Sequence, residues 1–222
     1  MNSIVLRIVS RLLGLPIIVG LILLLPAGTF DFWEVYAYFG ILLILMVFAM
    51  VYFLKHDPEL LKRRLEAKEK EDSQKMAVAI MALSILSIYI LSGLDHRFDW
   101  SRISLSVQVV GFVLVVAGYL FVVQVMRTNS FAARTVRVED SQTLVDTGLY
   151  GIVRHPMYSG VIVMYLGTPI ALGSWWGLVP LLVFLLGLYF RVVNEEEVLL
   201  NELEGYGSYR ERVRWRLIPG IL

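Results

Sequence analysis

The chain has 222 residues, of which 58% are hydrophobic, and its mean hydropathy is +0.71. Soluble domains are about 45–50% apolar, so this composition excludes an ordinary soluble protein and indicates an integral membrane protein. The formal net charge of +1 gives no reason to expect nucleic acid as a partner, and the absence of cysteine excludes disulfides, thiolate metal sites and a cysteine nucleophile.

Six apolar stretches approach the roughly 20 residues that are needed to cross a bilayer. They are 12–27, 33–54, 76–94, 103–126, 157–172 and 175–193. The sequence therefore predicts an all-α, polytopic integral membrane protein with about six transmembrane helices. Only Gly173 and Ser174 separate the last two stretches, which favours a helical hairpin over 157–193. If that hairpin is only partly inserted, five helices cross.

The chain is expected to have two regions. Residues 1–126 would hold four N-terminal transmembrane helices with a charged cytoplasmic loop at 55–75, and residues 127–222 would hold the hairpin and most of the polar chemistry. Because the 55–75 loop carries charges of both signs, it is typical of a solvated helical surface rather than of a lipid-binding basic patch. Glycines inside the apolar stretches would permit close helix approach, although single glycines often have no such role. These glycines are Gly111, Gly118, Gly160 and Gly167.

Lysine and arginine are enriched in short cytoplasmic loops of membrane proteins. In this chain they concentrate in the loops at 55–75 and 127–156 and in the tail after residue 209. In contrast, the stretch at 29–32 has no lysine or arginine, and the stretch at 95–104 has two arginines. Both termini are therefore expected on the cytoplasmic side, which agrees with an even number of crossings.

Two polar segments follow the fourth stretch. The first, "TVRVEDSQTLVDTGLY" at 135–150, is too short for a folded domain and would be a plain connector if it did not run directly into the second, "RHPMYSG" at 154–160. In the second segment Pro156 suits the first turn of a helix, whose free N–H groups favour an anion. His155 and Tyr158 add a ring nitrogen and a hydroxyl. The alternative is interfacial anchoring, because Arg, His and Tyr all favour the headgroup region.

A third polar segment, "RVVNEEEVLL" at 191–200, follows the last apolar stretch. On a helix Arg191 and Glu195 are four residues apart and share one face, whereas Glu196 and Glu197 point elsewhere, the latter toward solvent. Ionisable residues at a membrane helix are functional candidates. The alternative is an exposed ion pair at a helix end.

Other chemistries have little support. The chain has no glycine-rich phosphate loop and no G-x-G-x-x-G motif. His56, His96 and His155 are isolated and lack metal-ligand spacing, so no metal is expected. Ser159 lies near His155, but no orienting acid is visible, which makes a hydrolase unsupported.

The segments "NSFAARTVRVEDSQTLVDTGLYGIVRHPMYSG" and "RVVNEEEVLLNELEGYGSYRERVRWRLIP" resemble the isoprenylcysteine carboxyl methyltransferase family. That family is related to other integral-membrane methyltransferases, including phospholipid methyltransferases. The resemblance covers roughly residues 129–219 and follows an ordered series: T-L-V, T-G-x-Y, R-H-P-x-Y-x-G, R-x-x-x-E-E, Y-x-x-Y-x-x-R-V and I-P. Residues 1–126 match only as generic spans.

The resemblance implies S-adenosylmethionine as cofactor, held in a cytoplasmic pocket. It implies that the cofactor contacts are Thr135, Gln142, Thr143, Leu144, Val145, Tyr150, His155, Pro156, Met157, Tyr158 and Glu195. It also implies that Arg191 faces the acceptor substrate and that Arg191 and Glu195 are the catalytic pair. The segment 203–206 is one residue shorter than the family pattern, so the resemblance assigns no role to Tyr206 or Tyr209.

The expected reaction is methyl transfer to a hydrophobic, lipid-linked acceptor, such as a prenylated small molecule or protein, by a multi-pass membrane enzyme whose active site faces the cytoplasm. An ionised carboxylate needs no general base, and the two-pronged guanidinium of Arg191 would orient it. A phospholipid amine or a thiol is the alternative acceptor. A binding or transport protein without catalysis is the alternative of another class, and it rests only on the spans.

Overall fold

A computed structural model describes residues 2–66, 72–131 and 143–221. Within these ranges the secondary structure is entirely helical. The elements are α1 (Asn2–Ala27), α2 (Trp33–His56), α3 (Pro58–Glu66), α4 (Asp72–Phe98), α5 (Leu105–Thr128), η1 (Gly148–Gly151), α6 (Pro156–Ala171), η2 (Trp176–Leu178), α7 (Val179–Glu202) and α8 (Tyr206–Arg212). The predicted all-α membrane fold is confirmed at this level.

Each of the six predicted spans corresponds to a helix. Among the residues that the structure describes, four of these helices, in α2, α4, α5 and α7, are long and apolar enough to cross a membrane, whereas α6 has only 16 residues. The boundaries differ most at the first span, whose helix begins at Asn2, ten residues before the predicted start at 12, and at the last span, which begins after a 3₁₀ turn and continues to Glu202, nine residues beyond the predicted end at 193. Because α7 extends this far, Arg191 and Glu195 both lie within one continuous helix.

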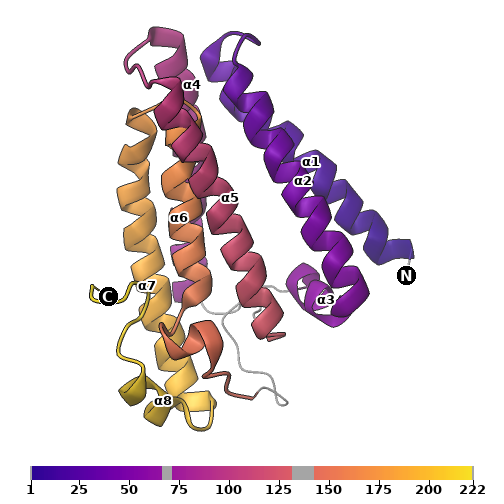
Figure 1. The fold of residues 1–222 in the computed structure, drawn as a ribbon, viewed down its shortest axis with the longest axis vertical. Helices are drawn as coiled ribbons and strands as arrows, with labels where there is room; N and C mark the ends of the chain where they lie inside the picture. The colour runs from indigo at the N-terminus through magenta and orange to yellow at the C-terminus, as the bar shows by residue number, and fades with distance from the viewer. Residues whose placement is uncertain (1, 67–71, 132–142, 222) are drawn as a thin grey trace.

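Helices α4, α5, α6 and α7 stand side by side, and the α1–α2 pair leans against them (Figure 1). Although α6 and α7 are consecutive, α6 packs mainly along α5 and α7 mainly along α4. Apolar side chains of α4, α6 and α7 meet around Phe184 and Leu188, and a second cluster around Val35 and Tyr38 joins α1 and α2 to the other helices. Helices α6 and α7 therefore do not form an isolated hairpin.

The α5–α6 contact is made by the four glycines that the sequence singled out. A Cβ atom at Gly118 would lie 2.5 Å from the Met164 nitrogen, and one at Gly111 would lie 2.4 Å from the Ala171 nitrogen. Gly160 and Gly167 meet the facing backbone of α5 in the same way. With van der Waals packing as the main driving force between membrane helices, these positions allow two backbones to touch, and α5 thereby sets the position of α6.

The end of the bundle near the α1–α2 connection contains buried acids. The prediction that a loop begins at residue 95 is wrong, because α4 continues to Phe98. Asp95 therefore lies inside α4, and it is only 1% exposed. Its carboxylate accepts hydrogen bonds from Ser101 and Ser174. On α2, Glu34 accepts from the Gln108 side-chain amide at 3.0 Å. Both carboxylates tie helices together at this end.

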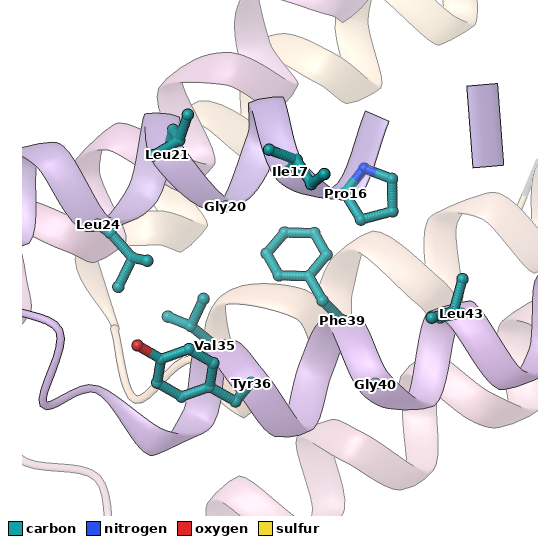
Figure 2. A pocket seen from close by; sticks show the side chains of 10 residues that line it. All are labelled: Pro16, Ile17, Gly20, Leu21, Leu24, Val35, Tyr36, Phe39, Gly40 and Leu43. Carbon is teal, nitrogen blue, oxygen red and sulfur yellow. The ribbon is translucent and has the colours of Figure 1, made fainter. Parts of the chain in front are cut away.

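An open apolar groove lies between α1 and α2 (Figure 2), with a volume of about 400 Å³. Gly20 and Gly40 leave room in it because they have no side chain, and Phe39 and Leu24 line it. The groove is near the α1–α2 connection, at the opposite end of the bundle from α8 (Figure 1). It is therefore not part of the site described next.

Candidate active site

The conspicuous polar cluster lies at the other end of the bundle, where α6 begins, α7 ends and α8 follows (Figure 1). Pro156 is the first residue of α6, as predicted, and His155 precedes it. The backbone N–H groups of Arg154 and His155 donate to the carbonyls of Trp215 and Arg216, both at 2.9 Å. The C-terminal segment thus returns along the R-H-P motif and closes one side of it.

Glu196 is the centre of a buried charge network. Its side chain is about 4% exposed, and its Oε1 accepts from Arg154 Nε at 2.6 Å and lies 3.3 Å from His155 Nε2. Its Oε2 accepts from Arg216 Nε at 3.0 Å. Arg154 also donates to the carbonyls of residues 213 and 214, at 2.6 and 2.8 Å. One carboxylate therefore joins α7, the R-H-P motif and the C-terminal segment.

Arg191 and Glu195 are linked through Tyr158. The Tyr158 hydroxyl donates to Glu195 Oε2 at 2.7 Å, and Arg191 Nε donates to the same hydroxyl at 2.9 Å. Arg191 is 5% exposed, which rules out the alternative of an exposed ion pair at a helix end. Residues from α6 and α7 that were predicted to share the site are therefore in direct contact.

His155 lies between the carboxylates of Glu195 and Glu196 on α7. Its Nε2 is 3.3 Å from Glu196, and its Nδ1 is 4.0 Å from Glu195 Oε1. The ring also stacks on Tyr158, with centroids 5.9 Å apart. Because Nε2 of His155 lies next to Glu196, its Nδ1 is directed toward Glu195. Of these two acids Glu195 is the partly exposed one, with 24% side-chain exposure.

Helices α3 and α4 support the site from the other side. Gln74 is 1% exposed and accepts from Arg191 Nη1 at 3.2 Å. Arg64 of α3 contacts the Met157 sulfur at 3.8 Å. The described residues of the 55–75 segment, 55–66 and 72–75, lie almost entirely in helices, as expected, but they are not simply a solvated surface, because Leu60 is fully buried against α2 and α5.

The segment 143–150 packs against α8. Leu144 contacts a cluster formed by Tyr206, Tyr209 and Val213. The Tyr209 hydroxyl donates to the Tyr150 carbonyl at 2.8 Å. Burial raises the pKa of Tyr150 to about 12, with the Asn129 hydrogen bond opposing and the charge of Glu195 reinforcing that shift, so its hydroxyl stays protonated at neutral pH.

The remaining predicted cofactor contacts fall as follows. Thr135 and Gln142 lie outside the described residues. Thr143 is exposed and Val145 is half-buried, both near the Leu144 position. Pro156 is buried and Met157 is half-buried at the start of α6. The structure brings His155, Tyr158, Arg191 and Glu195 together in one connected group. Leu144 and Tyr150 are not in that group but contact residues of α8.

Sequence reasoning missed four participants. Glu196 does lie on a different helical face from Glu195, as the 3.6-residue period predicts, but that face is covered by the returning C-terminal segment. The others are Arg154, Arg216 and Gln74. Arg154 lies in the R-H-P motif and Arg216 lies in the second of the two segments that carried the family resemblance, which was an available signal for them, whereas nothing in the local sequence distinguished Gln74 from a solvated residue.

Residues 107–207 match the family model described as phospholipid methyltransferase. Those residues are therefore similar to a family of membrane methyltransferases. The match includes most of α5, the whole of α6 and α7, and the R-H-P and R-x-x-x-E-E motifs.

Two curated relatives, from Oryza sativa subsp. indica and subsp. japonica, are named "Probable protein-S-isoprenylcysteine O-methyltransferase". Each is 30% identical over 113 residues, covering 48% of this chain and 59% of the relative. The chain thus spans less than two thirds of the length of these relatives. The resemblance to isoprenylcysteine carboxyl methyltransferases is confirmed over the matched residues.

Proposed function

We propose that this protein transfers a methyl group from S-adenosylmethionine to a hydrophobic, lipid-linked acceptor, with a carboxylate of the isoprenylcysteine type as the acceptor group. The observation that supports the proposal is the connected group Arg191–Tyr158–Glu195 at one end of a membrane helix bundle, in which Arg191 is buried and Glu195 is partly exposed, within the family-matched residues. The names of the rice relatives support the acceptor class.

The residues present suit this cofactor. S-Adenosylmethionine carries a sulfonium and an ammonium, and Glu195 offers a partly exposed carboxylate beside His155. The apolar cluster at Leu144 suits the purine. When bound, the cofactor supplies a methyl group on an already activated leaving group, so the protein need only bind and orient the two reactants. Orientation alone contributes roughly 7–11 kcal/mol in favourable systems.

In this proposal Arg191 orients the acceptor. Its guanidinium is held by Gln74 from α4 and by Tyr158 from α6, so the planar fork has a defined direction. A carboxylate acceptor is already ionised at neutral pH and needs no base. Tyr158 couples the acceptor side to Glu195 on the cofactor side, which keeps the two subsites at a constant separation.

We further propose that this end of the bundle faces the cytoplasm, with both termini on that side. The distribution of Lys and Arg supports this orientation. Four exposed tryptophans gather at the opposite end, which is typical of a membrane interface. They are Trp33, Trp100, Trp175 and Trp176. A cysteine introduced at exposed Arg102 is expected to react with an impermeant reagent outside intact cells, and protection of that cysteine would invert the orientation.

A phospholipid amine is the second candidate acceptor, and the description of the matching family model favours it. An amine must lose a proton before it attacks. Glu195 and His155 are the groups positioned to accept that proton, whereas Arg191 would repel an ammonium. The two candidates therefore differ in which residue of the Arg191–Glu195 pair controls the acceptor.

The proposed function is tested with purified protein, without added metal. S-Adenosylmethionine and S-adenosylhomocysteine are expected to bind, as measured by calorimetry and by thermal shift. Labelled methyl transfer into a host membrane extract, followed by identification of the labelled product, then distinguishes a carboxyl ester from a methylated amine. A folded protein that binds neither compound would leave the transport or binding alternative.

Replacement of Arg191 by lysine separates a two-pronged contact from a general attraction by positive charge. Lysine keeps the charge but loses the fork, and the loss of a charged hydrogen bond costs roughly 1.5–3 kcal/mol, or about ten- to a hundredfold. We expect a lower kcat or a higher acceptor KM, with the Kd for S-adenosylhomocysteine nearly unchanged. Loss of cofactor binding with intact acceptor binding would show that the roles are reversed.

A further inference from the structure

Tyr206, the first residue of α8, has a buried hydroxyl without a hydrogen-bond partner. The side chain is 3% exposed, and its oxygen makes no hydrogen bond within residues 2–66, 72–131 and 143–221. Tyr209, three residues later, is equally buried, but its hydroxyl donates to the Tyr150 carbonyl. Buried polar atoms are almost always satisfied in native proteins, so an exception requires an explanation.

The surroundings of this hydroxyl belong to the candidate active site. The Tyr206 ring packs with Leu144, Leu199 and Leu203 and lies 5.6 Å from the Tyr209 ring. Burial, reinforced by the negative charges of Glu196 and Glu195 and opposed by Arg154, raises the pKa of Tyr206 above its ordinary value. The group therefore remains a neutral O–H donor at all physiological pH values.

We infer that the Tyr206 hydroxyl donates a hydrogen bond to the adenosyl part of the bound cofactor. This inference rests on the proposed function and adds a binding residue to it. A ligand oxygen or nitrogen would satisfy the donor that the protein leaves unsatisfied. Since a buried phenol hydroxyl is costly without a partner, the arrangement is explained if a ligand completes it.

The chemistry of the neighbours selects the adenosyl part of the cofactor. The apolar leucines around Tyr206 suit a purine and would leave the charged amino-acid part of the cofactor without partners. The partly exposed carboxylate of Glu195, beside His155, suits the sulfonium and ammonium instead. A ribose oxygen or a purine nitrogen is therefore the acceptor that fits this position.

The test is Tyr206→Phe, which removes one oxygen atom and keeps the ring. In calorimetry the variant is expected to bind S-adenosylhomocysteine roughly three- to tenfold more weakly than the wild type, which is the range for one neutral hydrogen bond. Its melting temperature without ligand should stay the same or rise, because the unsatisfied hydroxyl is gone. A residue with a purely structural role would not produce this combination.

Tyr209→Phe is the matched control. It removes a hydroxyl that already has a protein partner, so it should lower the ligand-free melting temperature and affect cofactor affinity less than Tyr206→Phe does. As a competitor, 5′-methylthioadenosine, which lacks the amino-acid part, should show the same fold loss in Tyr206→Phe as S-adenosylhomocysteine.

Three results would overturn the inference while the wild type still binds cofactor. These are unchanged affinity in Tyr206→Phe, a fall in its ligand-free melting temperature as large as that of Tyr209→Phe, or a loss seen with S-adenosylhomocysteine but not with 5′-methylthioadenosine. Failure of the wild type to bind any of these compounds would instead refute the proposed function, so the two failures are distinguishable.

Discussion

Replacement of Gly118 by alanine is expected to destabilise the protein strongly, although alanine normally favours a helix. The new Cβ would lie 2.5 Å from the Met164 nitrogen and 2.6 Å from the Gly160 carbonyl oxygen. Both are backbone atoms of α6, so no side chain can move aside and the helices must separate. Overpacking costs about 1–3 kcal/mol in soluble cores, and we expect the upper end of that range or more. The measurement is thermal unfolding of the detergent-solubilised protein, followed by tryptophan fluorescence.

Gly40→Ala provides the control within the same protein. Gly40 also lies in an apolar membrane helix, but a Cβ atom there would meet no atom within 4 Å. Alanine exceeds glycine in helix propensity by about 1 kcal/mol, so this variant should be as stable as the wild type or more stable. Equal effects of the two substitutions would contradict the close α5–α6 contact. Because α6 positions His155 and Tyr158, Gly118→Ala should also reduce methyl transfer.

Glu196→Ala is expected to have the largest effect among substitutions at the site. It removes the carboxylate that neutralises Arg154 and Arg216 and leaves Arg154, which is 7% exposed, without an acid. Breaking a buried ion pair by removing one partner costs roughly 3–5 kcal/mol. At about 2–4 °C per kcal/mol for a chain of this size, the melting temperature should fall by about 10 °C.

The same variant should release the C-terminal segment, because Glu196 links it to α7 through Arg216. Limited trypsin digestion is therefore expected to cleave after Arg214 and Arg216 earlier than in the wild type. Glu197→Ala is the matched control, because Glu197 is the adjacent acid and is exposed. Exposed substitutions usually change stability by less than about 0.5 kcal/mol. Similar melting temperatures and cleavage rates for the two variants would refute the role assigned to Glu196.

Much of the fold follows from local patterns. Apolar length predicted six helices, and the structure has a helix at each of the six stretches. The helix start at Pro156 was predicted from the restricted φ angle of proline and its missing N–H. In contrast, hydropathy placed the end of the last helix at 193, because it registers the change from apolar to charged residues and not the end of the hydrogen-bonded helix at Glu202.

The site was predicted less completely than the fold. The motif residues His155, Tyr158, Arg191 and Glu195 are in contact, as the family resemblance implied. Glu196 was not recognised, because its role depends on a segment 20 residues later that folds back onto α7. Such contacts across the sequence leave no periodic signal near the residue itself.

By itself, the amino-acid sequence determined that this is a helical membrane protein and which short motifs carry its polar chemistry, because both depend on the composition and spacing of neighbouring residues. Only the tertiary structure decided how those motifs meet. Four glycines become a backbone contact only when α5 and α6 lie side by side. Arg154, Glu196 and Arg216 become one network only when the C-terminal segment returns to the R-H-P motif. These arrangements depend on packing between distant segments, where buried charges must find partners that no local pattern specifies.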